Sequence, residues 1–412
     1  MKAMNRILTI CLLGCAPAFA QVNPSATGPG RAPAGTSNLV YAFRYAQAAQ
    51  LNTQMADMQT SNVSATLDYA NRQQRYPFTM EYGGGYTWTL TGPGYLTGQF
   101  HRLLLTQGVD SRRSKLMLKD DVSYLPQAPT TGFSGIPGTG EIIGVPNPSP
   151  STTQTILTIN THVVDNMASA QFDRTISYAT TLGVTGAFDL LRYPDNNGLN
   201  INTANAGARL VRRLSGRTTL AGRGSFTQYS YPDASLSINT ITEDLGIQHK
   251  WTRNLTTDIT GGPQELGSNK SAIVPSSLRY SVDASVNYKL HYTAFNAAYT
   301  HGTNGGSGYM LGGTADVASV NFTHQFNPST LLGLTAGYNR TASLNSINGV
   351  TNAEFGGAQV TWRLGNNLIL FANYTAQNQT STAALPGNTL DQMINTIAFG
   401  FGLSSRDQRP RR

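Results

Sequence analysis

Apolar and polar side chains alternate with a period of two through most of the chain after residue 38. The segment 279–289 is the clearest case. Its even positions, from Tyr280 to Tyr288, are apolar or aromatic, and its odd positions are polar or charged. This period predicts β-strands with one apolar face. Tyrosine at both ends of the apolar face is typical of a strand that crosses both interfaces of a membrane.

Similar segments recur along the sequence, and we expect about 18 strands of this kind. The predicted strands are 38–47, 60–71, 76–90, 97–108, 113–124, 163–174, 180–193, 203–214, 217–231, 238–250, 255–263, 279–289, 292–302, 313–326, 330–341, 353–364, 367–377 and 391–403.

The predicted connections alternate between tight turns and longer polar loops. Ser215-Gly216 and Gly365-Asn366 are tight, whereas 303–312 and 342–352 are longer. Short turns on one side and long loops on the other are the pattern of outer-membrane barrels. An even number of strands places both ends of the barrel on the side of the short turns, which we expect to be the periplasm.

The predicted fold class is all-β: a transmembrane antiparallel up-and-down β-barrel of about 18 strands (range 14–18) over residues 38–403. Only 12% of the residues are charged, and no long apolar run follows the N-terminal segment. A soluble β-sandwich or propeller would also alternate, but single β domains routinely end near ~250 residues. A sheet in lipid must pair every backbone group, so it has to close.

The first residues predict export. Basic Lys2 and Arg6 precede the apolar stretch 7–13, and Ala18-Phe19-Ala20 forms a small-x-small site. We therefore expect a signal peptide over 1–20 that is cleaved after Ala20.

A lipoprotein signal is the alternative, because residues 12–15 resemble a lipobox and would leave a lipid on Cys15. Both cysteines, Cys11 and Cys15, precede the Ala20 site. With cleavage after Ala20, the mature chain would contain no disulfide and no thiolate metal site.

Two further segments differ from the barrel in composition. Residues 21–37 are rich in Pro, Gly, Ser and Ala and predict a flexible periplasmic leader. Residues 404–412 form a basic C-terminal tail, and the two ends of the chain carry much of the net charge of +8. The charge therefore gives no indication of nucleic-acid binding, and a solvated tail explains it.

The alternating strands, the interfacial tyrosines and the aromatic closing segment Ile397 to Leu403 together resemble bacterial outer-membrane β-barrels, in particular general and sugar-specific porins. The resemblance is architectural and covers 38–403. It implies a location in the outer membrane, contact with outer-membrane lipid and possible homo-oligomers. The closing segment resembles the signal read by the barrel-assembly machinery, although residues follow Leu403 where porins typically end in Phe.

If the polar face points inward, Thr, Ser, Asn, Gln and scattered charges line the lumen. The predicted pore-lining residues are Lys119, Asp121, Asp189, Arg209, Arg223, Asp244, Lys250, Asp258, Arg279, Asp283, Lys289 and Arg363. Such charges either create a transverse field that selects small polar solutes or form ion pairs that hold a wide barrel open. Their near balance of sign predicts only a mild anion preference.

The longest predicted external loop spans 126–162. By analogy with the third loop of general porins, it is a candidate to fold inward and narrow the pore. A surface lid or a partner-contact loop is the alternative.

Passive diffusion of small hydrophilic solutes is the predicted function. The alternatives are a structural or adhesive barrel with partner-binding loops and, as a weaker candidate, a barrel enzyme or lipid-handling channel. We expect no enzyme activity, cofactor or metal, because the six histidines are scattered and no HExxH motif occurs. His249 and His324 fall on the apolar face beside aromatic residues and are interpreted as interfacial.

Overall fold

The structure is a computed structural model of the full chain. It describes residues 37–52, 57–71, 75–92, 97–127, 161–195, 198–306, 310–345, 349–365, 367–382 and 391–405. The predicted signal peptide, nearly all of the predicted leader and most of the 126–162 loop and of the basic tail lie outside these residues.

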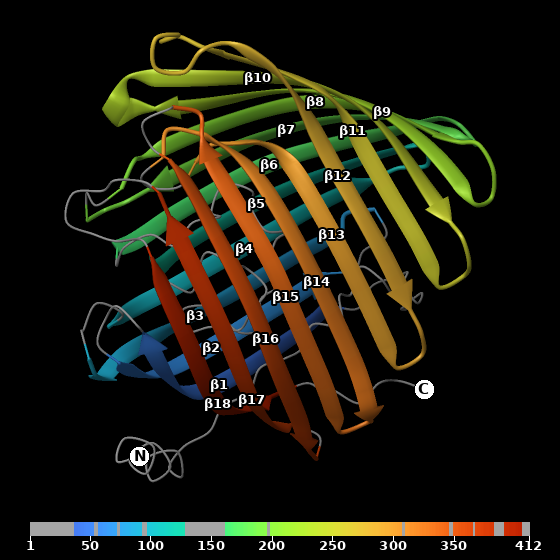
Figure 1. Cartoon of the computed structure of the whole chain (residues 1–412). Helices are drawn as coiled ribbons and strands as arrows, with labels where there is room; N and C mark the ends of the chain where they lie inside the picture. Colours follow the sequence, from blue (N-terminus) through green and yellow to red (C-terminus); the bar gives the residue numbers. More distant parts are fainter. Residues whose placement is uncertain are drawn as a thin grey trace.

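Eighteen strands make up almost all of the described chain (Figure 1). They are β1 (Ser37–Asn52), β2 (Met58–Asn71), β3 (Phe78–Thr91), β4 (Gly98–Asp110), β5 (Ser114–Gln127), β6 (Thr161–Ser177), β7 (Thr180–Arg192), β8 (Ile201–Arg213), β9 (Thr218–Tyr231), β10 (Leu236–Lys250), β11 (Leu255–Ser268), β12 (Ser277–Lys289), β13 (Thr293–Asn304), β14 (Gly313–Asn327), β15 (Thr330–Ser343), β16 (Val350–Leu364), β17 (Leu368–Ser381) and β18 (Gln392–Ser404). A short 3-10 helix, Pro232–Ala234, joins β9 to β10. No helix in the described part of the chain is long and apolar enough to cross a membrane.

The strands form one closed antiparallel sheet. Each strand pairs with its neighbours in the chain, and β1 also pairs with β18, from Ala42 opposite Ser404 to Asn52 opposite Ile394. Closure leaves the sheet without a free first or last edge, which a spanning sheet requires. The predicted all-β, up-and-down barrel is thereby confirmed.

The two faces of the sheet are opposite in character to those of a soluble barrel. On β17, Tyr374 is 45% exposed on the outer face, whereas its neighbours Asn373 and Thr375 point inward and are 6% and 7% exposed. The same alternation places Phe226 and Leu245 outward and Thr242 inward. An apolar exterior over a polar interior is the arrangement that a lipid surrounding favours.

The two ends of the barrel differ in their connections. We call the end with the even-to-odd joins, such as 178–179 and 328–329, the turn rim. The other end, with joins such as 269–276 and 305–312, is the loop rim. The first residues of β1 and the last of β18 lie together at the turn rim.

Several strands are longer than the sequence predicted, and β11 is the clearest case. It continues through Pro263 to Ser268, where the sequence predicted an end at residue 263. Pro263 pairs with Tyr280 of β12, but the pairing with β10 is interrupted between Thr242–Gln264 and Leu245–Gly261. β11 therefore accommodates Pro263, which has no backbone N–H, because it loses pairing at this point with β10 only and keeps its pairing with β12.

Candidate functional site: the inner wall and its constriction

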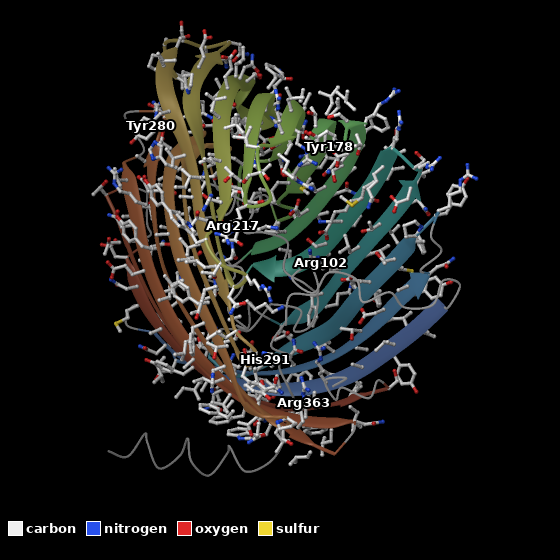
Figure 2. The ribbon with its side chains drawn as sticks, turned by 90° about the vertical axis from the view of Figure 1, so that its right-hand side faces the viewer. Arg102, Tyr178, Arg217, Tyr280, His291 and Arg363 are labelled. Carbon is white, nitrogen blue, oxygen red and sulfur yellow. The ribbon has the colours of Figure 1, made fainter. Side chains whose placement is uncertain are left out.

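The predicted pore-lining residues all occupy the strand face opposite the exposed aromatic and aliphatic side chains. They are Lys119 and Asp121 on β5, Asp189 on β7, Arg209 on β8, Arg223 on β9, Asp244 and Lys250 on β10, Asp258 on β11, Arg279, Asp283 and Lys289 on β12, and Arg363 on β16. Figure 2 shows the neighbouring inward residue Arg102 inside the barrel and Tyr280 on its outer surface. A role of these residues in solute passage remains a prediction.

A buried ion pair fixes one part of the wall. Arg102 of β4 donates from Nε and Nη2 to the two carboxylate oxygens of Asp121 at 2.8 and 2.7 Å. The Nζ of Lys119 lies 3.6 Å from the same carboxylate. Arg102 and Asp121 are 8% and 9% exposed. A bidentate pair with this burial holds both side chains in one orientation. The sequence prediction included Asp121 and Lys119 but missed Arg102, whose neighbours do not alternate cleanly.

A second ion pair crosses an intervening strand. Asp173 of β6, Gly183 of β7 and Arg209 of β8 lie directly opposite one another in the sheet. Arg209 Nη2 donates to both oxygens of Asp173 at 2.8 and 2.9 Å. A Cβ at Gly183 would lie 2.5 Å from Asp173 Oδ1 and 2.6 Å from Arg209 Nε. The absence of a side chain at this position therefore lets the two charges meet over β7.

Gly183→Ala is expected to break this pair and to lower the free energy of unfolding by roughly 1–3 kcal/mol, because the added methyl overlaps both partners. Urea-induced unfolding in phospholipid vesicles measures the change. Gly186→Ala on the same strand is the control, since a Cβ there meets only Asn205 O, at 3.9 Å. Equal losses for the two variants would contradict the assigned role of Gly183.

The same transverse row continues beyond Arg209. Arg223 of β9 lies opposite Arg209 on one side and opposite Asp244 of β10 on the other. Asp244 accepts a hydrogen bond from Ser281 of β12 at 2.5 Å, across Gly262 of β11. Arg209 is held by Asp173, whereas Arg223 is exposed and makes no hydrogen bond or ion pair with another described side chain. Arg223 is therefore an exposed cation on the inner wall, and its action on a solute remains a prediction.

Charge is distributed unevenly around the wall. Strands β1 to β12 carry eleven of the twelve predicted pore-lining residues, together with inward Arg44, Glu81, Asp165 and Asp173. On β13 to β18, Arg363 is the only charged residue at an inward position among those described, and Thr, Asn and Gln occupy most polar positions there. One side of the lumen is thus charged and the opposite side is polar but almost uncharged.

The inner wall also has an apolar part, which the sequence analysis did not predict. Near the loop rim, inward positions of β6 to β11 and adjoining loop residues form a buried apolar cluster. Its members are Val163, Leu191, Tyr193, Ile201, Tyr229, Tyr231, Leu236, Ile238, Leu266, Val274 and Leu344. Apolar side chains are buried on the lumen side only where another segment covers them.

Residues 303–306, which follow the part of β13 that pairs with β12 and which we call the β13–β14 tip, supply part of that cover. β13 pairs with β12 only as far as His301 opposite Val282. Beyond this point Thr303 N donates to Gln264 Oε1 of β11 at 3.1 Å, and Tyr231 OH of β9 donates to Gly305 O at 2.6 Å. The tip therefore lies against the inner wall of β9 to β11 and narrows the loop rim. The predicted constriction, loop 126–162, lies mostly outside the described residues.

The histidines lie beside aromatic rings. The His249 and Trp251 ring centroids are 4.6 Å apart, and those of His324 and Phe326 are 4.8 Å apart, both edge-on. These positions agree with the interfacial interpretation. Among the described residues, no three His, Cys, Asp or Glu side chains gather in a group that could hold a metal ion.

Comparison with known proteins gives similarity of structure without similarity of sequence. No family model matches the chain, and no curated protein matches it. Pseudomonas aeruginosa OccK2 (OpdF) aligns with 90% of this chain and 98% of its own, with a TM-score of 0.50 and 12% identity. The same protein in complex with glucuronate gives a TM-score of 0.49 at 12% identity, with coverage of 90% and 98%. Acinetobacter baumannii OccAB4 gives 0.48 at 8% identity, with coverage of 92% and 100%. The similarity to OccK2 extends over nearly all of both chains and supports the assignment of a porin-like barrel fold.

Proposed function

We propose that this protein is an outer-membrane channel for the passive diffusion of small hydrophilic solutes, with the loop rim facing outward. The observation that carries the proposal is the closed sheet of eighteen strands with polar and charged side chains inside and exposed apolar ones outside. Barrels of this strand number are wide enough for water and solutes, and segments that fold inward set the effective width. The β13–β14 tip at Gly305 is such a segment.

The direct test is conductance. Mature protein refolded in detergent and added to a planar bilayer is expected to give discrete current steps, and proteoliposomes are expected to swell in small sugars. A silent, correctly folded barrel would overturn the channel function and favour a structural or adhesive barrel. Release of fatty acids from phospholipid by the same sample would favour the enzyme alternative. Insertion by the barrel-assembly machinery through 397–403 and homo-oligomer formation remain predictions.

Arg223→Gln is expected to lower the anion-to-cation permeability ratio by up to about twofold. A unit charge ~10 Å from an ion in water contributes roughly 0.4 kcal/mol, and salt reduces this further. The reversal potential across a salt gradient measures the ratio. Arg212→Gln removes an exposed arginine from the outer face of β8 and is the matched control. The same shift in both variants would assign the effect to surface charge and not to the lumen.

A further inference from the structure

On the outer face of the barrel, where most lipid-facing positions are apolar, several polar side chains of neighbouring strands form a linked cluster. We call Tyr280, Tyr299, His301, Asp316 and Arg340 the outer polar cluster. They lie on β12 to β15, a few residues from the loop rim. Tyr280 is 58% exposed and is visible on the outer surface in Figure 2.

The cluster is held together by Asp316. Its Oδ1 accepts a hydrogen bond from Tyr299 OH at 2.9 Å and lies 2.7 Å from His301 Nδ1. Arg340 Nη1 lies 3.5 Å from Oδ2. The Tyr280 ring stacks on His301, with centroids 4.2 Å apart and planes 13° apart. These contacts fix the orientation of the side chains before any ligand arrives.

The position of the cluster matches the outer boundary of the membrane. A tilted strand crosses the hydrocarbon region in ~9–11 residues. On β14, Phe326 is an exposed aromatic residue at the turn rim, and a crossing of this length that begins at Phe326 ends near Asp316. On β15, the apolar outward positions from Leu332 to Ala336 end at Tyr338, and Arg340 follows. The cluster therefore lies at the level of the lipid headgroups, where polar side chains meet polar partners.

The chemistry of the cluster favours hydroxyl groups over an isolated anion. The charge of Arg340 is balanced by Asp316, and Glu354 lies exposed on the next strand opposite Tyr338. The faces of aromatic rings are partly negative and favour C–H groups, such as those on one face of a pyranose. The Asp316 carboxylate and the Arg340 guanidinium beside the exposed rings can bind the hydroxyls at the edge of the same sugar. We propose that the outer polar cluster binds the sugar headgroup of a glycolipid in the outer leaflet.

The experiment uses the full-length barrel in detergent, with native mass spectrometry to count retained lipids. The probes are a glucosyl diacylglycerol and, as a headgroup without sugar, phosphatidylglycerol. Wild type is expected to retain the glucosyl lipid preferentially. Tyr280→Leu is expected to weaken its binding about fivefold, the ratio that ~1 kcal/mol produces. Tyr288→Leu, on the same face of β12 at the turn rim, is expected to have no effect.

The outcomes are distinct from those of the conductance test, because lipid retention does not require an open pore. Equal losses in Tyr280→Leu and Tyr288→Leu, or equal retention of both lipids by wild type, would overturn the proposal. If Tyr280→Leu does not fold, Arg340→Gln provides the same test, with Arg212→Gln near the turn rim as its control. If Arg340→Gln then retains the glucosyl lipid as well as wild type does, the proposal is overturned.

Discussion

Val320→Arg is expected to destabilise the barrel by roughly 2–4 kcal/mol, the cost of a basic side chain at the membrane midplane on the lipid face. Val320 lies near the middle of β14, is 42% exposed and points outward. No lumen water reaches this position, so the guanidinium would have to extend toward a distant interface. Guanidinium-induced unfolding in phospholipid vesicles measures the decrease in the free energy of unfolding. In a thinner membrane the arginine side chain can reach water, and the decrease should then be smaller.

The control for this change is the adjacent residue. Asn321 is exposed on the lumen side, where its Oδ1 accepts a hydrogen bond from Thr335 at 2.9 Å. Asn321→Arg adds the same charge to the lumen face. We expect it to lower the free energy of unfolding by less than about 1 kcal/mol, the typical value of one exposed hydrogen bond. A larger loss for Asn321→Arg than for Val320→Arg would mean that the two faces of the sheet are assigned the wrong way round.

The faces and the number of strands were predictable because one physical rule acts on every strand. A period of two separates lipid-facing from lumen-facing positions, and a slip of one residue would expose polar side chains to lipid. All eighteen predicted strands are present, and residues such as Tyr280 and Tyr288 lie on the predicted outer face. The strand ends were less predictable. Pairing extends above the apolar band into polar segments, as in the last residues of β17, where alternation of hydrophobicity gives no signal.

Contacts between distant parts of the chain were not predictable from alternation. The Asp173–Arg209 pair depends on a glycine in the strand between them, and sequence spacing does not reveal which residues lie opposite Gly183. The apolar cluster is a similar case. Tyr229 and Tyr231 fall on the inward face, which is a signal that something covers them, but the partner at Gly305 lies far along the chain.

The two glycine crossings suggest how the wall keeps its charges in place. At Gly183 and at Gly262 a strand presents no side chain inward, and polar groups from the strands on either side meet over it. Each such contact links three strands, and at Gly262 it does so where the pairing between β10 and β11 is interrupted. Asp173 and Arg209 are thereby fixed as a pair and Asp244 is held by a hydroxyl, whereas Arg223 lies between the two crossings and makes no ion pair with another described side chain.

Tyr231→Ala is expected to release the β13–β14 tip from the inner wall. The ring is 1% exposed within the apolar cluster, and its hydroxyl donates to Gly305 O at 2.6 Å. Loss of a buried aromatic ring typically costs ~3–5 kcal/mol. In this case we expect the cost to weaken the packing of the tip against the inner wall. Tyr231→Phe removes only the hydrogen bond, worth about 0.5–1.5 kcal/mol, and should act in the same direction to a smaller extent.

Two measurements check the release. Amide hydrogen exchange at residues 303–306 should accelerate in both variants, more in Tyr231→Ala than in Tyr231→Phe, because the segment opens more often once Gly305 O loses its partner Tyr231 on β9. Single-channel conductance should rise in the same order as the constriction widens. Tyr374→Phe is the control, since its hydroxyl donates to Asn395 Oδ1 at 2.8 Å on the outer face. Faster exchange without any rise in conductance would show that the tip docks as described but does not limit the pore, and unchanged exchange would contradict the docking itself.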